Sequence, residues 1–293
     1  GALQQELEKL HIPYNGSGIR SSQTTINKYE TNEILAQHGV PVAKHAMAYK
    51  EDWLQDKEAF FQKIEAEFQY PFIAKPADDG CSSAVKKIKN RTELEAFTTL
   101  MFREMEELDP ACARTLSLGF KEEFPNKAGY LVESLITKNG AKHFLEITGG
   151  LLTKYSPDGT VSYEVFEASE ALAEGEVLSL EEKFLAGEGQ NITPARYAAD
   201  PERRQKISDK VKADLERVAR ILNIEGYARI DAFVRIFEND EVETIIIEVN
   251  SLPGMTPATC IFHQTAINGY KPYDFIDRIL KYGMERTKMK AEL

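Results

Sequence analysis

Two short segments in the last third of the sequence carry polar side chains at a spacing suited to binding a metal ion. Arg229 and Asp231 are two residues apart in the first segment, and Glu248 and Asn250 are two residues apart in the second. Because side chains alternate between the faces of a strand, each pair shares one face if its segment is extended. Two carboxylates and an amide oxygen, with no His or Cys nearby, suit Mg²⁺ or Mn²⁺, and Arg229 could hold a phosphate or another oxyanion.

A tight turn, Ser251 to Thr256, follows the second segment directly and includes Gly254. The turn leads into a predicted helix near 258–268, and free backbone NH groups at the start of a helix bind anions. Metal ligands that run into an anion-binding turn would suit a nucleotide phosphate. The alternative is that these polar side chains form the solvated face of an ordinary hairpin.

The two polar faces converge only if the segments form an antiparallel hairpin. Strands are predicted around 228–236 and 243–249, with the turn at 238–240. The strands and helices alternate along the chain with this hairpin inserted, which favours the α+β class over a pure doubly wound sheet. Helices are predicted over 2–10, 27–38, 51–68, 92–103, 207–222, 258–268 and 273–285, short strands near 72–74, 84–88, 130–135 and 144–148, and an irregular stretch over 156–194.

The composition is that of an ordinary globular protein. The 293 residues are 42% hydrophobic and 28% charged, and the formal net charge is −11. No long basic run is present, which argues against nucleic acid or an anionic membrane as a partner. No apolar run approaches the roughly 20 residues of a membrane span. Cys81, Cys112 and Cys260 are scattered and odd in number, as expected of free thiols in the cytoplasm.

The ordered set of motifs resembles the D-alanine–D-alanine ligase family of the ATP-grasp superfamily, and the resemblance spans nearly the whole chain. Its strongest part is Arg229-Ile230-Asp231 followed by the run from Ile247 to Thr256. Weaker matches are the segments 12–18, 27–28, 38–41 and 72–76. The resemblance implies an ATP-grasp fold, in which two α+β subdomains clasp ATP between them.

The resemblance also implies a division of the chain. Residues 1–25 would be a linker from an N-terminal domain that precedes this segment in the family, which makes the chain a fragment. Residues 26–135 would form the first ATP-grasp subdomain, and 136–293 the second, with the metal site. A homodimer through the missing domain or the N-terminal region is a further expectation.

In the family, two lysines contact the phosphates of ATP, and Lys28 and Lys75 resemble them. The turn 78–83, which includes Ser82, resembles the loop that folds over the phosphates, and Lys183 resembles the lysine that closes over the γ-phosphate. Without the family, each would be interpreted as an ordinary lysine or turn.

Glu133, Ser134 and Leu135 resemble the hinge where adenine binds. A second glutamate of the family contacts the ribose. An insertion blurs the alignment there, so that either His143 or Glu146 could occupy its place.

Asp231, Glu248 and Asn250 resemble the family's metal ligands, and Arg229 and the backbone near Gly254 resemble the groups that stabilise the tetrahedral intermediate. The implied reaction has two steps: a substrate carboxylate takes the γ-phosphate of ATP, and an amine then attacks the acyl phosphate.

The substrate side departs from the family's pattern. Thr259 falls near a position that helps to hold the carboxylate of the second substrate. Cys81 stands where the family usually has serine, and Phe184 stands where many members have tyrosine. A thiol is a poor hydrogen-bond donor and phenylalanine has no donor, although Tyr163 could supply the missing hydroxyl. We therefore expect an intact nucleotide side and an altered choice of amino acid.

Two functions follow from these motifs. The first is an active ATP-dependent ligase that joins a carboxylate to an amine, with D-alanine or another amino acid as substrate. The alternative is a nucleotide-binding module without ligase activity. An interaction domain with an acidic surface is disfavoured because it leaves the ordered motifs unexplained.

Overall fold

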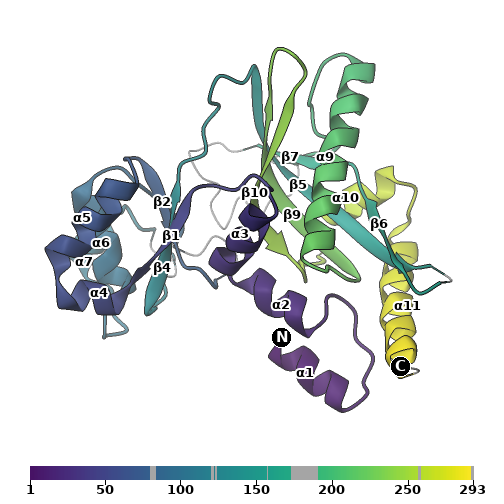
Figure 1. The fold of residues 1–293 in the computed structure, drawn as a ribbon, viewed down its shortest axis with the longest axis horizontal. Helices are drawn as coiled ribbons and strands as arrows, with labels where there is room; N and C mark the ends of the chain where they lie inside the picture. The colour runs from purple at the N-terminus through teal and green to yellow at the C-terminus, as the bar shows by residue number, and fades with distance from the viewer. Residues whose placement is uncertain are drawn as a thin grey trace.

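The computed structural model describes residues 1–79, 84–119, 122, 124–156, 158–172, 191–256 and 259–291. Two sheets, each with its own hydrophobic core, lie side by side in the molecule (Figure 1). All of the described strand pairs are antiparallel, so the α+β class predicted from the sequence is confirmed. None of the helices in the described ranges has the length and apolarity needed to cross a membrane.

The first sheet has the strand order β1-β4-β2-β3 and is covered by helices (Figure 1). Phe60, Phe97 and Tyr130 lie in its core, where aromatic rings meet edge to face. The strands are β1 (His45–Tyr49), β2 (Phe72–Lys75), β3 (Lys86–Ile88) and β4 (Gly129–Ser134), and the helices are α4 (Lys50–Gln55), α5 (Lys57–Glu67), α6 (Arg91–Met101) and α7 (Pro110–Thr115).

The second sheet has the order β10-β9-β5-β7-β8, and β6 pairs with β5. Helix α9 packs on one face through Val211, Leu215 and Val218, while α10 and α11 cover part of the other face through Ile261 and Phe275. The strands are β5 (His143–Tyr155), β6 (Val161–Val165), β7 (Ser169–Ala171), β8 (Asn191–Ile192), β9 (Tyr227–Ile236) and β10 (Val242–Asn250), and the helices are α9 (Pro201–Ile221), α10 (Cys260–Ile267) and α11 (Pro272–Ala291).

Three helices open the chain: α1 (Ala2–Lys9), α2 (Ile19–Ile26) and α3 (Lys28–Gln37). Asn27 begins α3 as its cap, because its side-chain oxygen accepts a hydrogen bond from the Glu30 amide. Leu35 and Val40 pack in the core of the second sheet, although they precede the first sheet in the sequence. The N-terminal segment is therefore attached to the second sheet.

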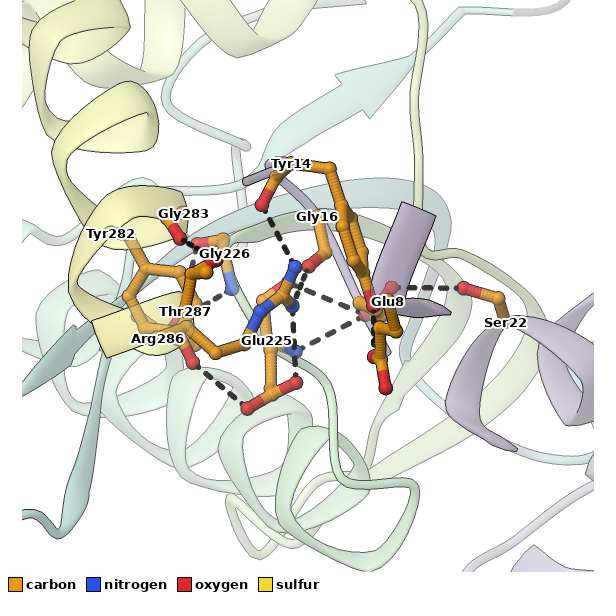
Figure 2. Close-up of polar contacts among 12 residues, drawn as sticks. Glu8, Tyr14, Gly16, Ser22, Glu225, Gly226, Tyr282, Gly283, Arg286 and Thr287 are labelled. Carbon is orange, nitrogen blue, oxygen red and sulfur yellow. Dashed lines mark hydrogen bonds and ion pairs between the residues drawn. The ribbon is translucent and has the colours of Figure 1, made fainter. Parts of the chain in front are cut away.

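A buried arginine on α11 fixes this attachment (Figure 2). Arg286 donates to the carbonyl oxygens of Gly16 and Tyr14 at 2.6 and 2.8 Å, and its guanidinium lies 3.2 Å from the Glu225 carboxylate. A Cβ atom at Gly226 would come within 2.7 Å of the Gly16 nitrogen, so the two backbones are in close contact. This junction joins the segment before α2, the start of β9 and the last helix.

The predicted hairpin over 228–236 and 243–249 is confirmed as β9 and β10. The single helix predicted over 51–68 is wrong, because Asp56 is extended and caps a separate helix by accepting a hydrogen bond from the Ala59 amide. The stretch 156–194, predicted as irregular, contains β6, β7 and β8. Helix α2 and strand β1 were not predicted, because α2 has only two apolar residues, Ile19 and Ile26, and β1 is only five residues long.

Candidate active site

The register of β9 and β10 brings the two polar pairs together. Asp231 lies opposite Glu248, and Arg229 lies opposite Asn250. Paired residues on neighbouring strands point to the same face of a sheet, so the convergence predicted from the sequence is confirmed.

A β-bulge makes this convergence possible. The register shifts between Ile246 and Glu248. Ile246 pairs with Ala232, and both belong to the hydrophobic core beneath α9. Without the extra residue, strict alternation would place Glu248 on that same core face. The bulge therefore turns Glu248 toward Asp231.

Arg229 and Asp231 form an ion pair on this face. Arg229 Nε lies 3.2 Å from Asp231 Oδ1, and a terminal guanidinium nitrogen lies 3.3 Å from Oδ2. The neighbouring Asp231 charge raises the pKa of Arg229, against the opposing effect of burial. Arg229 is therefore a permanent cation beside the two carboxylates.

A third strand contributes a side chain that the sequence motifs did not single out. Thr148 on β5 lies directly opposite Asp231, and its hydroxyl donates to Asp231 Oδ1. Cys260 is the first residue of α10, and the charges of Arg229 and Asp231 act on the pKa of its thiol in opposite directions. Burial raises the pKa of the Cys260 thiol, so it stays protonated at neutral pH. Nothing in the local pattern marks Thr148, because its role depends on which strand pairs with β9.

Lys28 reaches the same site from the start of α3. Its Nζ lies 3.1 Å from Glu248 Oε1 and also donates to the backbone oxygen of Asp79. The side chain is nearly buried, with 9% of its surface exposed. The predicted phosphate lysine and the predicted metal ligand are thus in direct contact.

A second cluster lies on the first sheet, where Lys75 on β2 contacts Glu133 on β4. Lys75 Nζ lies 2.7 Å from Glu133 Oε2, and Asn32 Nδ2 donates to Oε1 of the same carboxylate at 2.9 Å. Both charged side chains are buried. Ser134 ends β4, and Leu135 follows it with a half-buried side chain.

The two candidates for the ribose contact lie on opposite faces of β5. Glu146 and Thr148 are two residues apart and share the face that carries Asp231. His143 lies on the other face, and its Nε2 is 3.1 Å from the Arg196 carbonyl oxygen.

The remaining predicted residues are at the edge of the site or beyond the described ranges. Gly254 is exposed, and a Cβ atom there would have no neighbour within 4 Å. Thr259 precedes α10, and its hydroxyl donates to the Thr256 carbonyl oxygen at 2.7 Å. The described residues do not include four of the predicted positions: Cys81, Ser82, Lys183 and Phe184.

The donor set at β9 and β10 fits a hard divalent cation. Asp231, Glu248 and Asn250 supply only oxygen ligands, which suit Mg²⁺ or Mn²⁺. No group of three or more His, Cys, Asp or Glu suited to a metal occurs among the described residues. Nδ2 of Asn250 is buried without a hydrogen-bond partner in the described part of the chain, and a phosphate oxygen would satisfy it.

The sequence is similar to those of several ligases. A D-alanine–D-alanine ligase of Caldicellulosiruptor bescii is 26% identical over 293 residues, which cover 100% of this chain and 69% of that protein. A D-alanine–D-alanine ligase of Leptospira interrogans is 28% identical over 291 residues, covering 98% and 70% of the two chains.

Solved structures of such ligases share the fold. The D-alanine–D-alanine ligase from Coxiella burnetii superposes with a TM-score of 0.67 at 17% identity, covering 100% of this chain and 66% of the other. The VanG D-Ala:D-Ser ligase from Enterococcus faecalis superposes with a TM-score of 0.68 at 20% identity. The match covers 97% of this chain and 68% of the other. These likenesses support the predicted ATP-grasp fold, and the chain spans about two thirds of the length of its relatives.

The family model described as D-ala D-ala ligase C-terminus matches residues 34–108 and 142–281. The two matched ranges include Lys75 and the four polar residues paired across β9 and β10. The chain therefore belongs to the D-alanine–D-alanine ligase family, to which the resemblance of its motifs had pointed.

Proposed function

We propose that this chain is the nucleotide-binding and metal-binding part of an ATP-dependent ligase that joins a carboxylate to an amine through an acyl phosphate. The observation that carries the proposal is the opposed pair Asp231 and Glu248, with a cation beside each carboxylate. Membership of the ligase family favours this function over a nucleotide-binding module without ligase activity.

The metal ligands have a defined task in this proposal. Asp231, Glu248 and Asn250 would hold Mg²⁺ or Mn²⁺, which when bound supplies positive charge against the phosphate oxygens. Lys28 already neutralises Glu248 and lies beside the turn that begins at residue 78. It would shift its contacts toward a phosphate when nucleotide binds.

We assign Lys75 to the phosphates as well, and Glu133, Ser134 and Leu135 to the adenine. The nucleotide would lie between the two sheets, one formed within 26–135 and the other within 136–293. Glu146 is the better candidate for the ribose contact than His143, because Glu146 shares the face of Asp231.

Arg229 is placed to stabilise the charge that develops on the substrate. Its guanidinium is half-buried beside Asp231 and remains protonated. As the amine attacks the acyl phosphate, the carbonyl oxygen becomes an oxyanion, which a fixed cation stabilises more than it stabilises the ground state. Gly254 and Thr259 would border the second substrate.

Amino acids are the proposed substrates, since the relatives are named for D-alanine or for D-alanine and D-serine. Cys112 and Cys260 are free thiols, which supports our proposal that the enzyme works in the cytoplasm. A homodimer through the N-terminal region stays a prediction.

The test is phosphate release from Mg²⁺–ATP with a panel of D- and L-amino acids. Glu248→Gln should abolish the amino-acid-dependent release. The matched control is Glu243→Gln on the same strand, where the carboxylate instead pairs with Arg235. Equal activity of the Glu248→Gln variant and the wild type would contradict the assignment of the metal site.

A further inference from the structure

The metal-site residues belong to a longer row of polar side chains that crosses the second sheet. Strand pairing places Ser169 on β7 opposite Thr148 on β5, Thr148 opposite Asp231 on β9, and Asp231 opposite Glu248 on β10. Residues paired in this way share one face. The row therefore continues from the two carboxylates into the interior of the sheet.

Two donors meet at one oxygen of Asp231. The Thr148 hydroxyl and Arg229 Nε both donate to Oδ1. Arg229 also reaches Oδ2, at 3.3 Å. The two bonds to Oδ1 fix the plane of the carboxylate, and the Thr148 bond does so without adding a charge that would compete with a cation.

Thr148 is itself held in place from α10. Gln264 Nε2 donates to the Thr148 backbone oxygen at 2.7 Å and to the Ser169 hydroxyl at 3.0 Å. The Gln264 side chain is completely buried. A Cβ atom at residue 150 would come within 2.3 Å of Gln264 Oε1, so Gly150 leaves the space that this side chain fills. The position of Thr148 is thus set by packing.

We propose that Thr148 is a positioning residue that orients the Asp231 carboxylate toward the divalent cation. The inference rests on the proposed function. A second partner for Asp231 matters because Arg229 has two tasks, to hold Asp231 and to stabilise an oxyanion of the substrate. When Arg229 turns toward an oxyanion of the substrate, its bonds to Asp231 weaken, and the Thr148 hydroxyl still holds the carboxylate. Removal of a hydrogen-bond partner that orients a metal ligand typically lowers the affinity for the metal by about 10- to 100-fold.

Thr148→Val tests the proposal, because valine keeps the shape of threonine and replaces the hydroxyl with a methyl group that cannot donate a hydrogen bond. Thr148→Ser retains the hydroxyl and should rescue binding. The matched control is Thr153→Val on the same strand, where a buried hydroxyl accepts a hydrogen bond from the Gly226 amide, remote from the row. Thr148→Ala is a second variant without the hydroxyl, in case valine is not tolerated.

The probe is Mn²⁺ together with a non-hydrolysable ATP analogue, and the measurement is the electron paramagnetic resonance signal of free Mn²⁺. We expect Thr148→Val to weaken Mn²⁺ binding by about 10-fold. Affinity for the analogue without metal should be unchanged, which a general loss of structure would not allow. Thr148→Ser and Thr153→Val should bind Mn²⁺ like the wild type.

Wild-type Mn²⁺ affinity in the folded Thr148→Val variant would overturn the positioning role while leaving the proposed function intact. Equal losses in Thr148→Val and Thr153→Val would also overturn it, because the effect would then be structural. No binding of Mn²⁺ and analogue by the wild type would overturn the proposed function, and this inference with it.

Discussion

Lys28 Nζ lies 3.1 Å from Glu248 Oε1, although Lys28 begins α3 near the start of the chain and Glu248 lies near the end of β10. Both side chains are largely buried, at 9% and 17% exposure. Charges removed from water need a partner to remain ionised without a large cost. The contact therefore ties the N-terminal helices to the candidate metal site through charge, besides the packing of Leu35 in the same core.

Lys28→Met should destabilise the fold and weaken nucleotide binding together. Removing one member of a buried ion pair costs about 3 to 5 kcal/mol, because the other charge is left unpaired. We expect a loss near 3 kcal/mol in urea unfolding, and a smaller loss when Mg²⁺ is present to neutralise Glu248. Lys44→Met is the control, since its pair with Glu67 is 55% and 40% exposed and contributes at most about 1 kcal/mol. Equal effects of the two substitutions would contradict the prediction.

Mg²⁺–ATP should raise the melting temperature of the wild type, because the ligand binds only the folded state. At a ligand concentration 100-fold above Kd, the gain in unfolding free energy is about 2.7 kcal/mol. Glu248→Gln should lose most of the gain that depends on Mg²⁺, since an amide cannot replace the charge of the carboxylate. Differential scanning with ATP, with and without EDTA, measures both. Absence of any shift at millimolar nucleotide would count against ATP binding.

Substitutions of Lys75 and Glu133 should show strong energetic coupling in a double-mutant cycle, because the two side chains form a buried ion pair. Lys75→Met and Glu133→Gln each leave a buried group without its partner, and each should cost about 3 kcal/mol or more. The double variant should lose much less than the sum, because it leaves no unpaired charge. Denaturant unfolding of the four proteins gives the coupling energy. Additive losses would mean that the 2.7 Å contact contributes nothing.

Arg286→Met should release the N-terminal segment from α11. The guanidinium holds two backbone oxygens and the Glu225 carboxylate (Figure 2), and its removal should cost about 3 to 5 kcal/mol. Arg286→Lys should recover only part of this, because an ammonium lacks the fork geometry. Arg220→Met, which breaks a surface pair with Glu216, is the control. Hydrogen exchange of residues 12–18 should rise in the Arg286 variants alone.

The complete enzyme should be a poor D-alanine–D-alanine ligase or should prefer another pair of amino acids. The reason is the loss of two hydroxyls, at Cys81 and Phe184. Each lost neutral hydrogen bond costs about 0.5 to 1.5 kcal/mol, so the loss of both corresponds to roughly 5-fold to 160-fold in rate. Rates of phosphate release with D-alanine and with other amino acids give the comparison. Turnover with D-alanine alone at about 10 per second would contradict the prediction and would show that both substitutions are tolerated.

The sequence by itself determined the local features of this protein. A helix begins at 27–28 and the turn 238–240 joins two strands, as predicted, because helix starts and turns depend on side chains a few residues apart. The spacing of Arg229 and Asp231 sufficed to place them on one face, since alternation is a property of any strand. The family also follows from the motifs alone, because their residue types and their order along the chain are enough to identify it.

Only the tertiary structure decided which faces meet. Alternation puts Glu248 and Asn250 on one face, but it would also put Ile246 there, and Ile246 lies in the core. The bulge at Ile247 changes the phase of β10, and only then does Glu248 face Asp231. The contacts of Asp231 with Thr148 and of Glu248 with Lys28 join segments far apart in the chain. Such contacts depend on the pairing of strands and the packing of helices, which no local pattern specifies.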